Sequence, residues 1–393
     1  MILDTFPSAE EFYKTYWGQK PFVVHGAIDQ AVFEGVIDGD SLAGLALEED
    51  IKSRIVMTAP EGGKWTCEHG PFEEDRFGTL GEENWSLLVQ NVEQYHTDTA
   101  KLLQSFYFAP RWLMDDIMVS YSTAGGSVGP HTDSYHVFLV QGMGWRKWTI
   151  GESPVQNEDY IEGLDLKVLK GSVQGAEIEV GIGDVIYIPP YFAHEGITTQ
   201  EAMTFSVGFL GPKLSELMVE YGHYLEQMHQ GNKHYGGTGL DVESAGFAIA
   251  PGARDSIQND LINALRSNDF SIWLAEYFSM PSHDDIENID TRYEPLSDQD
   301  LLERLQDRQN LYRPEHIKIS MTTSSDETIN LAAYGAALPT SPAHNKLVHW
   351  LNQNNTLSMQ DIEALGGQDA LMTLITYLYN QNILFFENEA LDL

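Results

Sequence analysis

The stretch that decides the fold is DDIMVSYSTAGGSVGPHTDSY, residues 115–135. It begins with an apolar strand pattern, passes through a glycine-rich turn and ends at the closely spaced pair His131 and Asp133. From residue 116 to about residue 210 the chain continues as short β-rich segments separated by turn signals, without helical patterns between them. This series predicts an antiparallel sandwich or barrel. The expected strands are 117–122, 136–141, 146–150, 177–180, 184–188 and 203–210.

The segment before this core has a mixed character. Residues 1–110 alternate short apolar runs with acidic stretches, and residues 84–108 are predicted to form one amphipathic helix. We expect residues 1–212 to form one domain, in which the β core covers about residues 111–212.

After the core the pattern becomes helical. Apolar residues recur at helical spacing over 214–228, and a second helix is expected over 256–280. Two helices with apolar stripes cannot shield each other fully. The segment 213–281 must therefore pack on the barrel or on another subunit.

The acidic stretch 282–297 is interpreted as a linker to a C-terminal module, residues 298–393. Helices are expected at 298–311, 344–352 and 368–379, with short strands at 317–321 and 383–386, and this pattern predicts a winged-helix-like domain. From residue 296 onward, however, five Lys and Arg face thirteen Asp and Glu, which argues against DNA binding. The whole chain is thus predicted to be an α+β protein.

Composition narrows the classes of function. Lys and Arg number 22 against 59 Asp and Glu in 393 residues, a formal net charge of −37. Such a surface repels nucleic acid and anionic membranes and attracts a basic protein partner. The single cysteine, Cys67, excludes disulfide frameworks and thiolate metal sites, so a metal would need His, Asp and Glu ligands. Without a signal-like N-terminus or an apolar run of about 18 residues, we expect a cytoplasmic protein that does not enter a membrane.

The candidate metal ligands are His131, Asp133 and His194. Residues i and i+2 of a strand point to the same side, so His131 and Asp133 can converge on one ion. Two imidazoles and one carboxylate on one face of a metal are the ligand set of non-haem Fe(II) oxygenases. The His-x-Asp pattern also occurs at 96–98 and 283–285, but only the copy at 131–133 follows a glycine-rich turn and enters a strand region.

A second element fits a dicarboxylate co-substrate. Arg146 lies on the expected strand that follows the candidate ligands, and its guanidinium can bind a carboxylate with two parallel hydrogen bonds. Ser122, on the strand before the glycine-rich turn, can add a hydroxyl donor. Lys147 points to the opposite face and is the weaker candidate.

These motifs together resemble the JmjC-type ribosomal oxygenases, in particular the bacterial ribosomal-protein arginine hydroxylases. The resemblance rests on residues 115–135, on GDVIYIPP at 183–190 and on His194, and the domain order agrees over nearly the whole chain. It implies a double-stranded β-helix core of the jelly-roll, cupin-like JmjC type, a helical dimerisation segment over 213–281 and a C-terminal winged-helix-like domain.

The resemblance also implies roles for residues. His131, Asp133 and His194 would bind Fe(II), and Arg146 with Ser122 would hold 2-oxoglutarate, which reacts with O₂. The substrate would be an arginine of a basic ribosomal protein, the sixteenth of the large subunit, and the enzyme a homodimer. The residues at the positions that surround the substrate arginine in the family are Asp116, Met118, Tyr135 and Ser206.

Alternatives remain open from the residues alone. Within the same superfamily the chain can be a histidyl hydroxylase or a lysyl demethylase, because Asp116 favours a cationic target without separating arginine from methyl-lysine. In a different class, the barrel can be a non-catalytic cupin-type metal-binding or sensor module. A third possibility is an interaction scaffold whose helices only dimerise.

Overall fold

The computed structural model describes residues 1–58, 64–228, 230–281, 292, 294–324, 327–386 and 389. The chain divides into two compact units, Met1–Gly211 and Pro212–Leu393. Within the described residues, no helix has both the length and the apolar character needed to cross a membrane.

The first unit is built on two sheets. The large sheet has nine strands in the order β1-β2-β10-β7-β12-β6-β5-β3-β4, and the small one has three in the order β11-β8-β9. Apart from the parallel pair β1 and β2, the strand pairs of these sheets are antiparallel. The strands are β1 (Ile2–Leu3), β2 (Phe22–Val24), β3 (Ser53–Met57), β4 (Thr66–His69), β5 (Trp85–Val89), β6 (Met114–Ser122), β7 (His136–Met143), β8 (Arg146–Pro154), β9 (Gly175–Val180), β10 (Val185–Ile188), β11 (Phe192–Thr198) and β12 (Ala202–Phe209).

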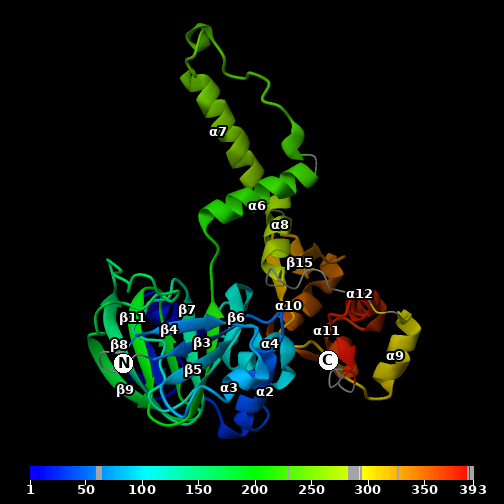
Figure 1. Ribbon diagram of the computed structural model, residues 1–393. Coiled ribbons are helices and arrows are strands. Elements are labelled where there is room, and N and C mark those ends of the chain that lie inside the picture. Colours follow the sequence, from blue (N-terminus) through cyan, green and yellow to red (C-terminus); the bar gives the residue numbers. More distant parts are fainter. Residues whose placement is uncertain are drawn as a thin grey trace. The chain divides into compact units, whose positions relative to one another are not determined.

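Each face of the large sheet buries a different apolar cluster. Toward the small sheet lies a cluster that includes Val137, Leu139, Trp148 and Ile188. The opposite face packs under the helical segments, with an aromatic-rich cluster that includes Phe138. Figure 1 shows α2, α3 and α4 on the side away from β8, β9 and β11. Two facing antiparallel sheets with one covered outer face give the predicted double-stranded β-helix.

The helical segments of this unit are short. They are α1 (Ala9–Glu11), η1 (Phe12–Tyr16), η2 (Gln30–Glu34), α2 (Gly39–Leu45), α3 (Glu74–Phe77), α4 (Val92–Tyr95), α5 (Thr97–Ala100), η3 (Lys101–Phe106) and η4 (Arg111–Leu113).

The prediction of one helix over residues 84–108 is wrong. Residues Trp85–Val89 form β5, which pairs with β3 and β6 in the large sheet, and the rest is two single helical turns and a 3-10 segment. Asn91, with φ of +55°, separates the strand from the first turn. Tertiary pairing of a buried apolar run thus overrides a helical pattern.

The second unit begins with α6 (Leu214–Gln227), α7 (Pro251–Leu265) and α8 (Asn268–Ser279). The helix predicted over 256–280 is therefore two helices, because Ser267 caps α8 by accepting from the backbone N–H of Phe270. Helix α8 is bound to the sheet β14 (Ile319–Thr323), β15 (Ile329–Ala333) and β16 (Ala336–Ala337). Thr322 Oγ1 donates to the carbonyl of Ser271 at 2.6 Å, and the Gly335 N–H donates to Ser279 Oγ.

The rest of the unit is helix-rich with a small sheet of order β17-β13-β18. A capping box of Ser358 and Asp361 begins the helix Met359–Leu365. That this module is a winged-helix domain stays a prediction, and residues 282–291 and 293 of the predicted linker lie outside the described residues. The elements are η5 (Gln230–Asn232), η6 (Val242–Ser244), α9 (Asp298–Gln306), β13 (Leu311–Tyr312), η8 (Pro342–His344), α10 (Asn345–Gln353), β17 (Thr356–Leu357), α11 (Met359–Leu365), α12 (Gln368–Asn380) and β18 (Phe385–Phe386).

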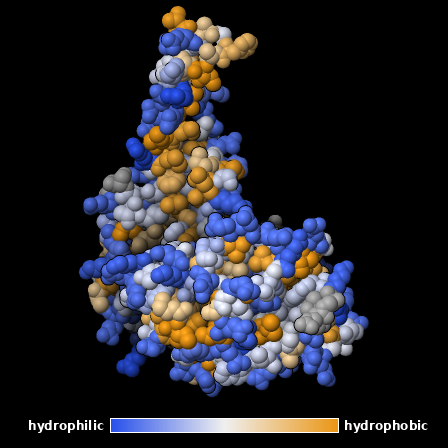
Figure 2. Space-filling model, turned by 90° about the vertical axis from the view of Figure 1, so that its left-hand side faces the viewer, coloured by the Kyte–Doolittle hydropathy of each residue, from blue (hydrophilic) through white to orange (hydrophobic). Residues whose placement is uncertain are grey.

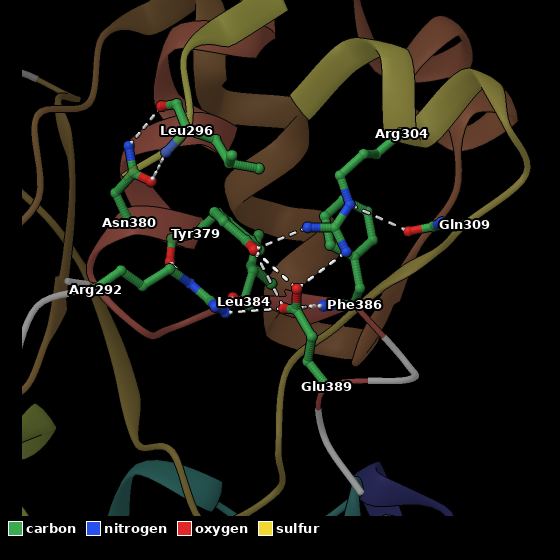
Figure 3. Close-up of polar contacts among 9 residues, drawn as sticks. All are labelled: Arg292, Leu296, Arg304, Gln309, Tyr379, Asn380, Leu384, Phe386 and Glu389. Atoms are coloured by element: carbon green, nitrogen blue, oxygen red, sulfur yellow. Dashed lines mark hydrogen bonds and ion pairs between the residues drawn. The ribbon is translucent and has the colours of Figure 1, made fainter. Parts of the chain in front are cut away.

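A polar cluster fastens the end of this unit, as Figure 3 shows. The carboxylate of Glu389 forms ion pairs with Arg292 at 3.2 Å and with Arg304 at 3.0 Å, and it accepts a hydrogen bond from Tyr379. Arg292 also donates to the Tyr379 carbonyl and lies over its ring. The cluster ties α9, the end of α12 and the segment after β18 together.

Candidate active site

The structure brings the three predicted ligands together. Ligand atoms of His131, Asp133 and His194 all lie within 4.8 Å of one another. The backbones of His131 and His194 exchange two hydrogen bonds of 3.0 and 2.9 Å, which join the loop after the glycine-rich turn to β11. The carbonyl of Asp133 accepts from the Tyr191 N–H at 2.7 Å. Backbone pairing therefore fixes the main chain at all three residues.

Hydrogen bonds also select the tautomer of each histidine. Nδ1 of His131 donates to the carbonyl of Gly129, and Nδ1 of His194 donates to that of Phe192. The Nε2 atoms then carry the lone pairs and face Asp133, at 3.9 and 3.4 Å from its carboxylate. Burial, with the charge of His131, lowers the pKa of His194 to about 4. His194 is thus neutral near pH 7, the form that binds metal.

Arg146 is a buried cation without an acidic partner in the described part of the chain. Its side chain is 3% exposed, Nε has no hydrogen-bond partner, and burial lowers its pKa to about 10. The guanidinium donates to Thr204 Oγ1 at 3.2 Å, to Ser120 Oγ at 3.4 Å and to the carbonyl of Gly196 at 3.4 Å. A buried charge held only by neutral groups is costly. The orphaned Nε and the uncompensated charge fit a carboxylate ligand.

The serine that hydrogen-bonds to Arg146 is Ser120, whereas the co-substrate role predicted for Ser122 stays a prediction. Ser122 is fully buried and donates to Oγ of Ser86 at 2.7 Å, away from Arg146. Ser120, two residues earlier and on the same side of β6, accepts from Arg146 and lines the same cavity. The sequence alternation marks both serines equally, and only the position of β8 decides between them.

Arg146 and the candidate ligands line one cavity of about 580 Å³ inside the first unit. Its walls are alternate residues of the strands, as expected for one face of each sheet. The cavity-lining residues from the strands and ligand loop include Asp116, Met118, Ser120, Tyr135, Val137, Leu139, Arg146, Trp148, His194, Thr204, Ser206 and Gly208.

The four predicted substrate residues, Asp116, Met118, Tyr135 and Ser206, all line this cavity. Ser206 lies directly opposite Met118 in the ladder between β12 and β6. Burial and the nearby carboxylates of Asp133 and Asp116 raise the pKa of Tyr135 well above its usual value. Tyr135 therefore keeps its proton and stands beside negative charge, an environment that suits a cationic guest.

Comparisons with known proteins agree with this geometry. The model of the JmjC domain matches residues 101–217. The chain is 31% identical to ribosomal protein uL16 3-hydroxylase of Escherichia coli over 379 residues, which cover 96% of this chain and 97% of that protein. The chain belongs to the JmjC-type ribosomal oxygenases. The resemblance inferred from the motifs is confirmed.

Solved structures of the same family are similar to this ribosomal oxygenase over nearly its whole length. The X-ray structure of E. coli YcfD is 31% identical, with a TM-score of 0.80, over 96% of this chain and 98% of that one. A structure of YcfD in complex with cobalt and 2-oxoglutarate gives the same identity and coverage with a TM-score of 0.78. The predicted fold class, a JmjC-type β-helix core with additional helices, is confirmed.

Sequence reasoning missed several residues of the ribosomal oxygenase site. Thr204 shares a strand face with Ser206, so alternation is a signal that points to it. Its hydroxyl donates to Oε1 of Gln141 at 3.0 Å, and the amide of Gln141 is fixed by donating to the Met143 carbonyl. This chain of hydrogen bonds leaves the oxygen of Thr204 facing Arg146 as an acceptor. Gln141 carries no motif that the sequence alone reveals.

The segment between β8 and β9 also borders the site. Thr132, between the two ligands of the His-x-Asp motif, donates to Glu158 at 2.5 Å. That hydrogen bond and one from Tyr160 lower the pKa of Glu158. Because Glu158, Tyr160 and Asp165 all line the cavity, the segment forms part of its rim. It has no strand or helix pattern that would have predicted this position.

Proposed function

We propose that this ribosomal oxygenase is an Fe(II)- and 2-oxoglutarate-dependent hydroxylase that acts on an arginine side chain of ribosomal protein uL16. The observation that carries the proposal is the buried guanidinium of Arg146, without an acidic partner, in the same cavity as a His-Asp-His cluster. Two such groups suit a co-substrate that chelates a metal at one end and carries a carboxylate at the other.

When bound, Fe(II) and 2-oxoglutarate supply the oxidation of a C–H bond by O₂. The chain's own residues position the ion and the co-substrate and exclude water from the reacting atoms. His131, Asp133 and His194 would hold the ion through Nε2 atoms and a carboxylate. Arg146, oriented by Thr204 and Ser120, would bind the distal carboxylate of 2-oxoglutarate. The apolar walls, which include Leu139 and Trp148, limit the access of water to the reacting atoms.

Arginine is the proposed target because of the charge and shape at the other side of the cavity. Asp116 can pair with a guanidinium, and Tyr135 offers an aromatic ring whose hydroxyl keeps its proton. The name of the E. coli relative supports uL16 as the protein that carries the target. A protein that modifies ribosomal proteins would act in the cytoplasm, and at a net charge of −37 we propose no direct contact with nucleic acid.

The test is an intact-mass scan of ribosomal proteins incubated with the enzyme, Fe(II), ascorbate and 2-oxoglutarate. We expect one added oxygen on uL16, absent with His131→Ala, and fragmentation should place it on arginine. Oxygen on histidine or loss of a lysine methyl group would contradict the proposed target residue. Succinate formation without any modified protein would place the substrate elsewhere, and the absence of both would contradict the oxygenase assignment for this chain.

We also propose that the second unit forms a homodimer through α6, α7 and the segment between them. Ile257, Leu261 and Leu265 recur every four residues on α7, and each is exposed. Figure 2 shows apolar side chains along the part of the molecule that α6 and α7 form. The exposed apolar residues include Leu214, Met218, Val219, Val242, Phe247, Ile249, Ile257, Leu261 and Leu265. Monomeric proteins rarely expose so many contiguous apolar side chains.

A further inference from the structure

Gly208 lines the part of the cavity that the proposed substrate residues form. It lies near the end of β12, a strand whose residues are all buried, between β6 and β7. It lines the cavity together with Asp116 and Tyr135. A glycine inside a central strand weakens that strand relative to alanine, and it often marks a place where a ligand approaches the backbone closely.

The backbone of Gly208 does not require glycine. Its φ lies outside the left-handed region, so any L-residue can adopt the conformation. A β-carbon at this position would meet no backbone atom closer than 3.7 Å. Neither a left-handed backbone nor a clash with the main chain therefore explains the glycine at this position.

The β-carbon would instead enter the space between the two proposed substrate residues. It would lie 3.3 Å from Oδ1 of Asp116 and 3.7 Å from Cε2 of Tyr135. These are side-chain atoms of opposite walls, so the missing side chain of Gly208 keeps a slot open between a carboxylate and an aromatic ring.

A β-bulge lies beside this slot. Val207 pairs with Ile117 and Phe209 pairs with Met114, so Asp115 and Asp116 on β6 together face Gly208. Neighbouring residues of a regular strand point to opposite faces, yet both aspartates line the cavity. Bulges near active sites commonly redirect a side chain in this way. Alternation from Met118 already places Asp116 on the cavity side opposite Gly208, and the bulge brings Asp115 to the same side.

We propose that Gly208 determines substrate specificity, because its missing side chain leaves the slot in which the substrate's guanidinium lies between Asp116 and Tyr135. This inference rests on the proposed arginine hydroxylation. It assigns the fit of a planar, cationic group to a residue that has no side chain. Gly208 is neither a candidate metal ligand nor one of the hydrogen-bond partners of Arg146.

Two substitutions and a matched control test this role. Gly208→Ala should lower kcat/KM for uL16 at least tenfold, and Gly208→Val should lower it more than a hundredfold. The Kd of 2-oxoglutarate for the Mn(II)-loaded protein should change less than twofold in both. The control is Gly211→Ala, three residues further on, where a β-carbon would meet nothing within 4 Å. It should behave like the wild type.

A binding measurement does not depend on turnover. Nα-acetylarginine amide is titrated with the Mn(II)- and 2-oxoglutarate-loaded protein, and paramagnetic broadening of its side-chain protons is recorded. We expect broadening with the wild type and Gly211→Ala and none with Gly208→Val. Equal broadening or equal hydroxylation with Gly208→Val would overturn the inference, as would loss of 2-oxoglutarate binding in that variant.

The two proposals fail in distinguishable ways. If the wild type leaves uL16 unmodified but still broadens the arginine probe, the proposed substrate protein is wrong and the slot stands. If the wild type hydroxylates uL16 and Gly208→Val does so at the same rate, only the role of Gly208 is wrong. If the wild type does not broaden the probe, the slot does not bind a guanidinium.

Discussion

At the scale of single residues, Arg146 combines a structural cost with a proposed binding role. Its guanidinium is buried, and no carboxylate of the described residues pairs with it. Such a charge destabilises the empty protein and is compensated when an anion binds. The residue therefore affects stability and co-substrate affinity in opposite directions.

We predict that Arg146→Met weakens binding of 2-oxoglutarate to the Mn(II)-loaded protein by about tenfold to a hundredfold or more. The reason is that a hydrogen bond to a charged group contributes about 1.5–3 kcal/mol, and about 1.4 kcal/mol corresponds to a factor of ten. Isothermal titration calorimetry measures the Kd. In the absence of 2-oxoglutarate the variant should unfold at a higher temperature than the wild type.

Lys147→Met is the matched control for this prediction. Lys147 is the next residue on β8, points outward and pairs with Glu177 at 2.7 Å. It should leave the affinity for 2-oxoglutarate unchanged. An equal loss in both variants, or none in Arg146→Met, would show that Arg146 does not hold the co-substrate.

At the scale of elements, the polar cluster around Glu389 holds the end of the second unit. Burial raises the pKa of Glu389, but hydrogen bonds from Arg304, the Phe386 N–H and Tyr379, together with the charge of Arg292, outweigh it and leave the pKa below 4.5. A carboxylate with a lowered pKa stabilises the folded state above its unfolded pKa. That contribution is lost as the pH falls through the folded value.

We predict that Glu389→Gln lowers the free energy of unfolding at pH 7 by about 1–3 kcal/mol, because two arginines lose their anionic partner. The difference from the wild type should shrink as the pH falls from about 4.5 through the lower folded pKa of Glu389, at which the wild-type carboxylate takes up a proton. Urea unfolding at several pH values measures it, and faster hydrogen exchange should appear in α9 and α12. Glu363→Gln, an exposed site on α11, is the control. A pH-independent difference would mean that charge is not the cause.

At the scale of the whole molecule, the exposed stripe on α7 predicts self-association. We expect a dimer at micromolar concentration by light scattering, and Ile257→Glu with Leu261→Glu should produce monomers because a charge is costly in a buried apolar contact. Val32→Glu, an exposed apolar site in the first unit, should remain dimeric. A monomeric wild type would contradict the dimer.

The net charge of −37 gives a second prediction at this scale. Attraction to a basic protein substrate is screened by salt, so kcat/KM for uL16 should fall about tenfold or more between low and half-molar salt. Turnover of 2-oxoglutarate without protein substrate should change far less over the same range. A salt-independent kcat/KM would show that the acidic surface does not guide the substrate.

The sequence determined by itself the β core, the three candidate metal ligands and the family. The two-residue spacing of His131 and Asp133 predicts that they converge, although both lie in the loop before β7 and not on a strand. The glycine-rich turn and the GDVIYIPP strand mark the segments that bring His194 to them. Such signals are local, because each depends on neighbouring residues and on the two-residue period of a strand. These signals can therefore be recognised without knowing which strands pair.

Only the tertiary structure decided which side chains meet across strands. It placed Ser120, and not Ser122, in hydrogen-bonding contact with Arg146, with Thr204 and Gln141 forming the next hydrogen bonds. It also placed Asp115 and Asp116 opposite Gly208 at a bulge. It also turned residues 85–89, predicted as helix, into a strand between β3 and β6. The physical reason is that register and bulges depend on pairing between segments far apart in the chain, and a shift of one residue turns every side chain to the opposite face.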